Sequence, residues 1–244
     1  MIMRCLAALG LFVALAACST TRPAPQEKIE RIRTIGVIID PWDEIEVTQG
    51  GFDFARRTYS AAEWRLPKAF IDGIRQALAP RYEVIPIPAL NIPAEEEYIY
   101  LSERWDVDRV VAPSIAAAGI TADAYLYLDI QPNFEPIDRT SAPPRGCGVQ
   151  SIAMMFQDGS IDAIYCVAYL RLLEPGAVPG RLDVIGSAKL LSDGYDKGMV
   201  APLENFTWQG VSLTDQQIDF LKTAFPYVIR RDIPISLRAL GLIE

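Results

Sequence analysis

The 244-residue chain contains no histidine. This absence excludes Ser-His-Asp and Cys-His nucleophile systems, zinc sites built on histidine, and the side chain that most often acts as a general base at neutral pH. Carboxylates or a serine-lysine pair could still support catalysis. The missing imidazole therefore makes a binding or structural role the stronger expectation.

Phosphate-binding loops are missing as well. Gly146-Cys147-Gly148 lacks the third glycine of a dinucleotide fingerprint, and no Walker-type loop occurs. Basic residues are outnumbered, with 23 Lys and Arg against 31 Asp and Glu and a formal net charge of −8. Such a chain is repelled by phosphate backbones. We expect no cofactor, no nucleotide and no nucleic-acid partner.

A long uninterrupted apolar run occurs at the start of the chain. Residues 5–17 follow Arg4 without a charge. They are too few to cross a bilayer, which takes about 20 residues, but they suit the apolar region of an export signal. The run ends in Leu15-Ala16-Ala17-Cys18, which resembles the lipobox of bacterial lipoproteins. Ordinary signal cleavage after Ala14-Leu15-Ala16 is one alternative, and a coincidental cysteine at position 18 is another.

The lipobox resemblance implies lipid on Cys18, a thioether-linked diacylglycerol and an N-acyl chain, which together give stable anchoring. Ser19 and Thr20 lack the aspartate that retains enterobacterial lipoproteins in the inner membrane. The resemblance therefore favours the periplasmic face of the outer membrane. We expect a signal over residues 1–18, a flexible Pro-containing tether over 19–28, and a single globular domain over 29–244.

The hydrophobic pattern predicts an α/β (α+β) fold, with a mixed sheet and helices packed on it. The first half indicates a β-α-β-α-β order, with a hairpin around Gly50-Gly51 and a capping box at Ser60–Glu63. Its strands are expected at residues 34–40, 82–87 and 109–115, and its helices at 67–79 and 93–105.

The second half indicates an antiparallel meander followed by C-terminal helices. Its strands are expected at residues 124–130, 149–156, 161–173 and 182–191. Thr214–Gln217 has the spacing of a second capping box. The helix that it opens is expected to kink or break near Pro226, and a last short helix is expected after Pro234.

The order of a buried strand, Gly50-Gly51-Phe52, a capped helix and the segment 81–86 (Arg-Tyr-Glu-Val-Ile-Pro) resembles a group of uncharacterised proteobacterial exported proteins. This resemblance covers about the first half of the chain. More loosely, an export signal before a small α/β domain is similar to envelope lipoproteins with a domain like the TolB amino-terminal one. Neither resemblance implies a catalytic residue.

Two cysteines remain after export, Cys147 and Cys166. The periplasm permits a disulfide. A tight turn at Asp158-Gly159, however, would place Cys166 opposite Ser151 and leave Cys147 about 13 Å away along the strand. A disulfide and two buried free thiols both remain open.

Four carboxylates cluster after the first strand: Asp40, Asp43, Glu44 and Glu46. Ligands of open α/β sheets tend to bind at the carboxyl ends of the strands, and hard cations take oxygen ligands. The cluster is thus a candidate metal site, or a solvated acidic loop.

Two further sets of polar residues lie on expected strands. Ser187 and Lys189 alternate on one strand, as a serine-lysine dyad or as ordinary solvent-facing residues. Four tyrosines could form a contact surface, because aromatic residues are enriched at interfaces, or could simply suit strands. They are Tyr125, Tyr127, Tyr165 and Tyr169.

Together these features predict a membrane-anchored lipoprotein of the bacterial envelope, a non-catalytic binding or scaffold component. Its expected partners are the membrane, through the N-terminal lipid, and another envelope protein or polymer. The alternatives are a carboxylate- or metal-dependent envelope hydrolase and a small-ligand carrier.

Overall fold

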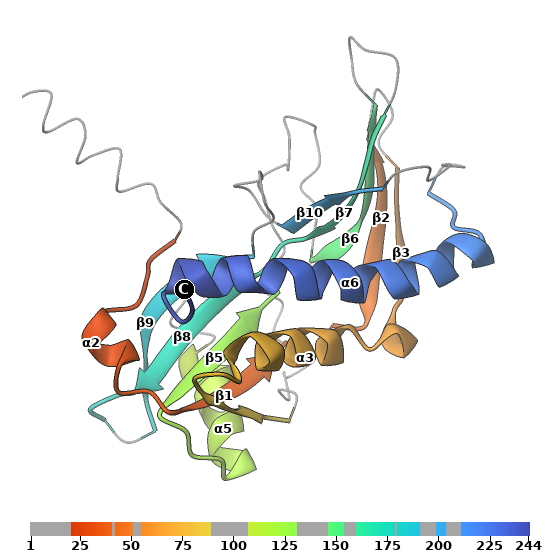
Figure 1. The fold of residues 1–244 in the computed structure, drawn as a ribbon. Coiled ribbons are helices and arrows are strands. Elements are labelled where there is room, and N and C mark those ends of the chain that lie inside the picture. The colour runs from red at the N-terminus through yellow and green to blue at the C-terminus, as the bar shows by residue number, and fades with distance from the viewer. Residues whose placement is uncertain are drawn as a thin grey trace, which may run out of the picture.

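The structure is a computed structural model that describes residues 21–40, 42–50, 55–88, 107–130, 146–153, 160–178, 180–190, 199–203 and 211–244. In this part of the chain, strands form two five-stranded mixed sheets, and helices pack on them (Figure 1). The expected α/β fold class is confirmed. The strands, however, divide between two sheets rather than forming one.

The first sheet, sheet A, holds three parallel strands and two antiparallel ones. In spatial order they are β4 (Glu83–Pro86), β1 (Thr34–Ile39), β5 (Ala124–Asp129), β8 (Tyr169–Pro175) and β9 (Leu182–Lys189). Strand β1 is the apolar, β-branched run identified in the sequence. Ile38 and Ile39 are both buried and belong to different apolar clusters, so β1 is covered on both faces.

The second sheet, sheet B, extends the molecule at the end away from α2 (Figure 1). In spatial order its strands are β10 (Met199–Pro202), β7 (Ser160–Cys166), β6 (Cys147–Ala153), β2 (Glu44–Gly50) and β3 (Ala55–Ser60). The hairpin expected around Gly50-Gly51 is confirmed by the antiparallel pairing of β2 with β3.

The expected meander is confirmed in two of its antiparallel pairings, β6 with β7 and β8 with β9. The expected pairing of β5 with β6 is wrong, because β5 pairs with β8. The segment 161–173, read as one long strand, is divided at Val167-Ala168 into β7 of sheet B and β8 of sheet A. An apolar run does not reveal where a strand leaves one sheet for another.

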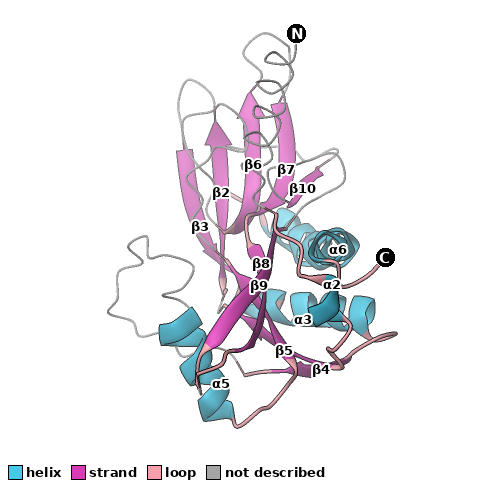
Figure 2. Ribbon diagram, turned by 90° about the vertical axis from the view of Figure 1, so that its left-hand side faces the viewer, coloured by secondary structure: helices cyan, strands magenta, loops and turns pink. Residues whose placement is uncertain are grey.

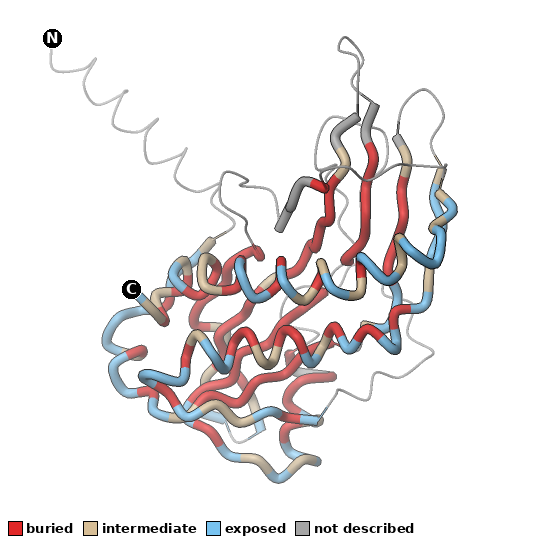
Figure 3. Tube along the Cα trace, turned by 45° about the vertical axis from the view of Figure 1, so that its right-hand side comes forward, coloured by how far each residue is buried: buried red, intermediate tan, exposed pale blue. Residues whose placement is uncertain are grey.

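Within the described ranges, six helical segments accompany the sheets: α2 (Gln26–Ile29), η1 (Ala62–Trp64), α3 (Leu66–Leu78), η2 (Val107–Val111), α5 (Ala112–Ala118) and α6 (Asp215–Leu240). Helices α3 and α6 cover one face of sheet A and α5 covers the other (Figure 2). Figure 3 shows that buried positions run along the strands and the inward sides of α3 and α6.

Residues 109–115 are helical, so the strand expected there is wrong. This β-branched segment forms parts of η2 and α5. Val107, Val111 and Ile115 recur four apart and are buried in the cluster beneath sheet A, the spacing of a helical face. The helix expected over 93–105 lies outside the described residues.

Helix α6 begins as expected and ends differently. The capping box at Thr214 and Gln217 is confirmed. Helix α6 does not break at Pro226, and the separate last helix is wrong, because α6 runs through both Pro226 and Pro234. Buried side chains on both sides of each proline hold it against α3 and the sheets. The capping box at Ser60 is also wrong, since α3 follows Arg65 in the left-handed region at φ 52°.

The segment expected to be a flexible tether instead packs on the domain from Arg22 onward. Arg22 forms an antiparallel bridge with Ser187, Ala24 donates to the carbonyl of Leu240, and Ile29 of α2 is fully buried. The folded part therefore begins near residue 22 rather than residue 29. Within the described residues, no helix has both the length and the apolar character that crossing a bilayer requires.

Candidate functional site

Four neighbouring strands of sheet A bury polar side chains at the end that meets sheet B. We call this set the buried polar cluster; it comprises Asp40, Tyr127, Asp129, Tyr169, Arg171 and Lys189. Strand alternation and register place them on one face: Tyr127 lies opposite Arg171, Asp129 opposite Tyr169, and Tyr169 opposite Lys189. All are buried except Tyr169, which is partly exposed.

Asp40 links β1 to β5. It follows β1 directly, and its backbone N–H donates to the carbonyl of Leu128. Its Oδ1 accepts from the Tyr127 hydroxyl at 2.8 Å, and its Oδ2 accepts from the Ile130 backbone N–H at 3.0 Å. A buried carboxylate needs such donors, because burial without them is costly. Asp40 thus links the carboxyl ends of the parallel strands β1 and β5 by hydrogen bonds.

Asp129 and Arg171 form a buried ion pair between β5 and β8. Arg171 Nη2 lies 2.6 Å from Asp129 Oδ2, and the two side chains are 3% and 1% exposed. Next to them, Lys189 Nζ lies 5.8 Å from the centre of the Tyr169 ring, within the range of a cation–π contact. Opposite charges thus lie side by side in the interior of the sheet.

The polar face continues into sheet B through Glu46 and Tyr165. The Tyr165 hydroxyl lies 3.4 Å from Glu46 Oε2, and Arg56 forms an ion pair with Glu46. Gly148 lies between them in the register. A Cβ on Gly148 would come within 2.6 Å of the tyrosine oxygen and 2.0 Å of the Glu46 carbonyl, so only glycine leaves room for this contact.

The four carboxylates of the candidate metal site do not converge. Asp40 faces Tyr127 in sheet A, Glu46 pairs with Arg56 in sheet B, and Asp43 and Glu44 are exposed. The chain passes from one sheet to the other between them, which separates side chains that are close in sequence. Among the residues that the structure describes, no three His, Cys, Asp or Glu side chains gather as a metal site requires.

The four candidate interface tyrosines do not form an exposed surface. Tyr125, Tyr127 and Tyr165 are at most 4% exposed. Tyr125 and Tyr127 lie in the apolar cluster with α5, where their rings pack and their hydroxyls bond inside the protein. Their alternation reflects a strand covered on both faces, so the contact-surface prediction is wrong for these three residues.

Cys147 and Cys166 form a disulfide. They lie directly opposite each other in the β6–β7 register, in which Ser151 pairs with Asp162. The register assumed from a two-residue turn at Asp158-Gly159 is therefore wrong, because Ser160 lies opposite Ala153. This register places the two cysteines opposite each other.

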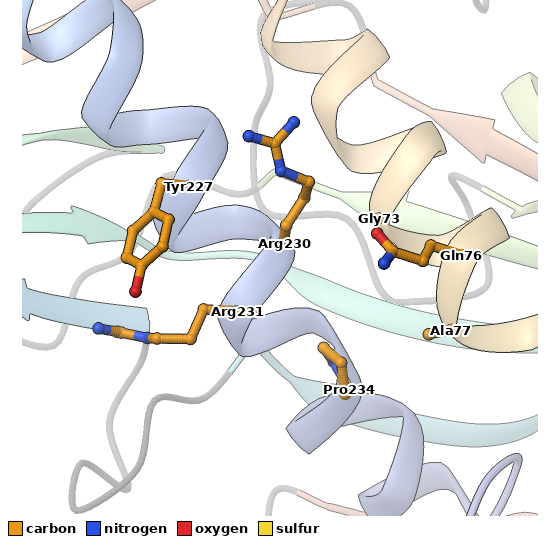
Figure 4. A pocket seen from close by; sticks show the side chains of 7 residues that line it. All are labelled: Gly73, Gln76, Ala77, Tyr227, Arg230, Arg231 and Pro234. Atoms are coloured by element: carbon orange, nitrogen blue, oxygen red, sulfur yellow. The ribbon is translucent and has the colours of Figure 1, made fainter.

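An open cleft lies between α3 and α6 on the outer side of the molecule. It has a volume of about 570 Å³ and is lined by Gly73, Gln76, Ala77, Tyr227, Arg230, Arg231 and Pro234. Figure 4 shows Arg230 between the helices on the side of Gln76, with Tyr227 and Arg231 further round α6. Tyr227 is 63% exposed, the most exposed large apolar side chain among those described.

The α3–α6 cleft presents fixed hydrogen-bonding groups. Arg231 is oriented by two contacts to Asp232, from Nε at 2.5 Å and from Nη2 at 2.8 Å. Pro234 has no N–H, so the carbonyl of Arg230 lacks its usual helical donor. Gly73 lets the helices approach, because a Cβ there would lie 3.0 Å from Ile233 Cδ1. This site was not predicted from the sequence; its available signal was Tyr227 followed three residues later by two adjacent arginines.

No protein-family model matches the chain, and neither a curated protein nor a solved structure matches it.

Proposed function

We propose that this protein is a lipid-anchored component of the bacterial cell envelope that acts as a binding or scaffold protein rather than an enzyme. The observation that carries the proposal is the Leu15-Ala16-Ala17-Cys18 motif at the end of an uncharged apolar run. Acyl chains on Cys18 would hold the domain on a bilayer. The absence of aspartate after Cys18 supports the outer membrane, on its periplasmic side.

The α3–α6 cleft supports the binding part of the proposal. It offers an exposed aromatic ring, Tyr227, beside two arginines, a combination enriched in the energetically important parts of protein interfaces. Arginine forks also suit carboxylate and phosphate groups. In a chain with a formal net charge of −8, the Arg230 guanidinium favours an anionic envelope partner at this cleft, whereas the Arg231 guanidinium is ion-paired with Asp232.

A photo-crosslinking amino acid in place of Gln76 tests the binding role in living cells. Gln76 is exposed and lines the cleft, whereas its neighbour Arg75 is exposed and does not line it. We expect a discrete adduct from position 76, a much weaker one from position 75, and loss of the adduct on Arg230→Glu. Equal adducts from the two positions, or none from position 76, would contradict binding at the cleft.

Anchoring is tested separately by Cys18→Ser and by mass spectrometry of the mature amino terminus. We expect an acylated cysteine in the original chain and release of Cys18→Ser from the membrane fraction. An unmodified terminus, or membrane association that persists in Cys18→Ser, would contradict the lipid anchor and leave the crosslinking result to stand alone.

A further inference from the structure

The chain just after the proposed lipid site is fixed to the domain. The backbone of Arg22 exchanges two hydrogen bonds with Ser187 of β9, at 2.7 and 2.8 Å. Ala24 then donates to the Leu240 carbonyl at 3.1 Å and packs over Gly186, where a Cβ would lie 3.1 Å from the Ala24 side chain. The N-terminal segment is thereby held against the edge of β9 and the C-terminal end of α6.

This attachment limits the distance between the folded domain and the proposed lipid site at Cys18. Four peptide steps separate Cys18 from Arg22, and each spans at most about 3.6 Å, so the two Cα atoms are at most about 14 Å apart. If Cys18 carries lipid, as the proposed function holds, the bridge between Arg22 and Ser187 lies close to the headgroup layer.

The same segment carries a local excess of positive charge. Residues 22–33 contain four basic and two acidic residues, a net of +2, in a chain whose formal net charge is −8. The basic residues are Arg22, Lys28, Arg31 and Arg33, and the acidic ones are Glu27 and Glu30. Each of the four basic side chains is exposed or partly exposed. Basic residues near an anionic bilayer surface are attracted to it.

A hollow beside α2 adds recognition groups to this end of the domain. It has a volume of about 610 Å³, and its lining includes Lys28 and Arg31 as well as Asp123, Glu174 and Ile185. Ile185 lies two residues from Ser187 on β9, so the hollow is adjacent to the Arg22 bridge. Lys28 is ion-paired with Glu174 across this hollow, so Arg31 is the cationic side chain that suits the phosphate of a lipid headgroup.

We infer that the end of the domain formed by α2, the edge of β9 and the C-terminal end of α6 is a membrane-binding surface that rests on phospholipid headgroups beside lipidated Cys18. Arg31 contacts the headgroup phosphates, while Lys28 remains ion-paired with Glu174. Figure 1 shows α2 and the C-terminus at one end of the molecule and sheet B at the other. The surface therefore directs sheet B and the N-terminal end of α6 away from the bilayer.

Fluorescence quenching by headgroup-labelled lipid tests this orientation in the full lipidated chain. A probe is attached to Gln26→Cys, at an exposed position of α2, or to Asp219→Cys, which is exposed near the far end of α6. Residue 219 lies about 31 Å along the helix from Leu240. Vesicles contain phosphatidylcholine with phosphatidylglycerol. We expect strong quenching at position 26 and little at position 219.

Charge reversal separates a bound surface from simple proximity. Arg31→Glu is expected to lower quenching at position 26 about fivefold or more, since one basic residue at an anionic surface is worth about that factor. Arg75→Glu makes the same charge change on the exposed side of α3 and is expected to leave quenching unchanged.

Protein that floats with the vesicles yet shows equal quenching at positions 26 and 219 would overturn the inferred surface while leaving the anchor intact. Equal changes of quenching at position 26 in Arg31→Glu and Arg75→Glu would also overturn the inferred surface. Failure of the chain to float with vesicles would instead count against lipidation of Cys18, so the two proposals fail in different ways.

Discussion

The two ends of strand β5 carry carboxylates in opposite settings. Asp129 ends the strand inside the protein, 1% exposed, and forms an ion pair with Arg171. Asp123 precedes the strand at the surface, and its Oδ2 accepts from the backbone N–H groups of Arg33 and Thr34 at 2.8 and 2.9 Å. Each carboxylate connects β5 to another segment of the chain, but only the first does so away from water.

This difference predicts very different energies for similar contacts. A buried charge without its partner keeps the full penalty of desolvation, whereas an exposed charge is solvated whether or not it is bonded. Removing any member of the buried polar cluster should therefore lower the free energy of unfolding. Removing the exposed carboxylate of Asp123 should change that free energy little at neutral pH.

Arg171→Leu is expected to have the largest effect. It leaves the Asp129 carboxylate buried without this guanidinium, and removal of one member of such a pair costs about 3–5 kcal/mol. Urea denaturation at neutral pH measures the free energy of unfolding. The double variant Asp129→Leu/Arg171→Leu should recover part of the loss, because no charge of the pair then remains. A decrease of less than about 1 kcal/mol in the free energy of unfolding of Arg171→Leu would contradict the expected dependence on burial.

Tyr127→Phe is expected to have an intermediate effect. It removes the hydroxyl that donates to Asp40 Oδ1, while the Ile130 N–H still serves Oδ2. Loss of a donor to a buried acceptor costs about 1–3 kcal/mol. Tyr227→Phe is the matched control, because Tyr227 is 63% exposed and should change stability by less than about 0.5 kcal/mol. Equal stabilities of the two variants would show that burial of the tyrosine hydroxyl does not determine how much it contributes to the free energy of unfolding.

The fold class was predictable because hydrophobic periodicity and local capping are short-range signals. Strand β1, the β2–β3 hairpin and the capping box at Thr214 follow from residues that are neighbours in sequence. Strand partners are set by packing over the whole chain, so the division at Val167-Ala168 left no local signal. In α6, burial on both sides outweighs the proline signals that indicate breaks.

The candidate sites were less predictable than the fold. Asp40 and Glu46 were singled out as chemically notable and are indeed buried, but in different sheets and with different partners. Arg171 was not singled out, because nothing local distinguishes a buried arginine from a surface one. The α3–α6 cleft depends on how two helices pack, and this contact joins residues more than 150 positions apart.

Asp123→Asn is expected to have the smallest effect at neutral pH and a clear one in acid. Backbone N–H groups of Thr34 and Arg33 hold the pKa of Asp123 below its usual value. The ionised carboxylate therefore adds stability above the unfolded-state pKa of about 3.9, and that stability is lost as the pH falls through the lower folded-state pKa. Asparagine keeps a carbonyl oxygen for both donors but does not titrate in this range.

The variant and the original chain are compared by urea denaturation at neutral pH and at several values below pH 4. The loss of stability in acid should be smaller in Asp123→Asn, so the two profiles converge as the pH falls. Parallel profiles would mean that the contacts of Asp123 with Thr34 and Arg33 do not discriminate between its charged and neutral forms. The exposed end of β5 would then contribute to structure without contributing to the pH dependence of unfolding.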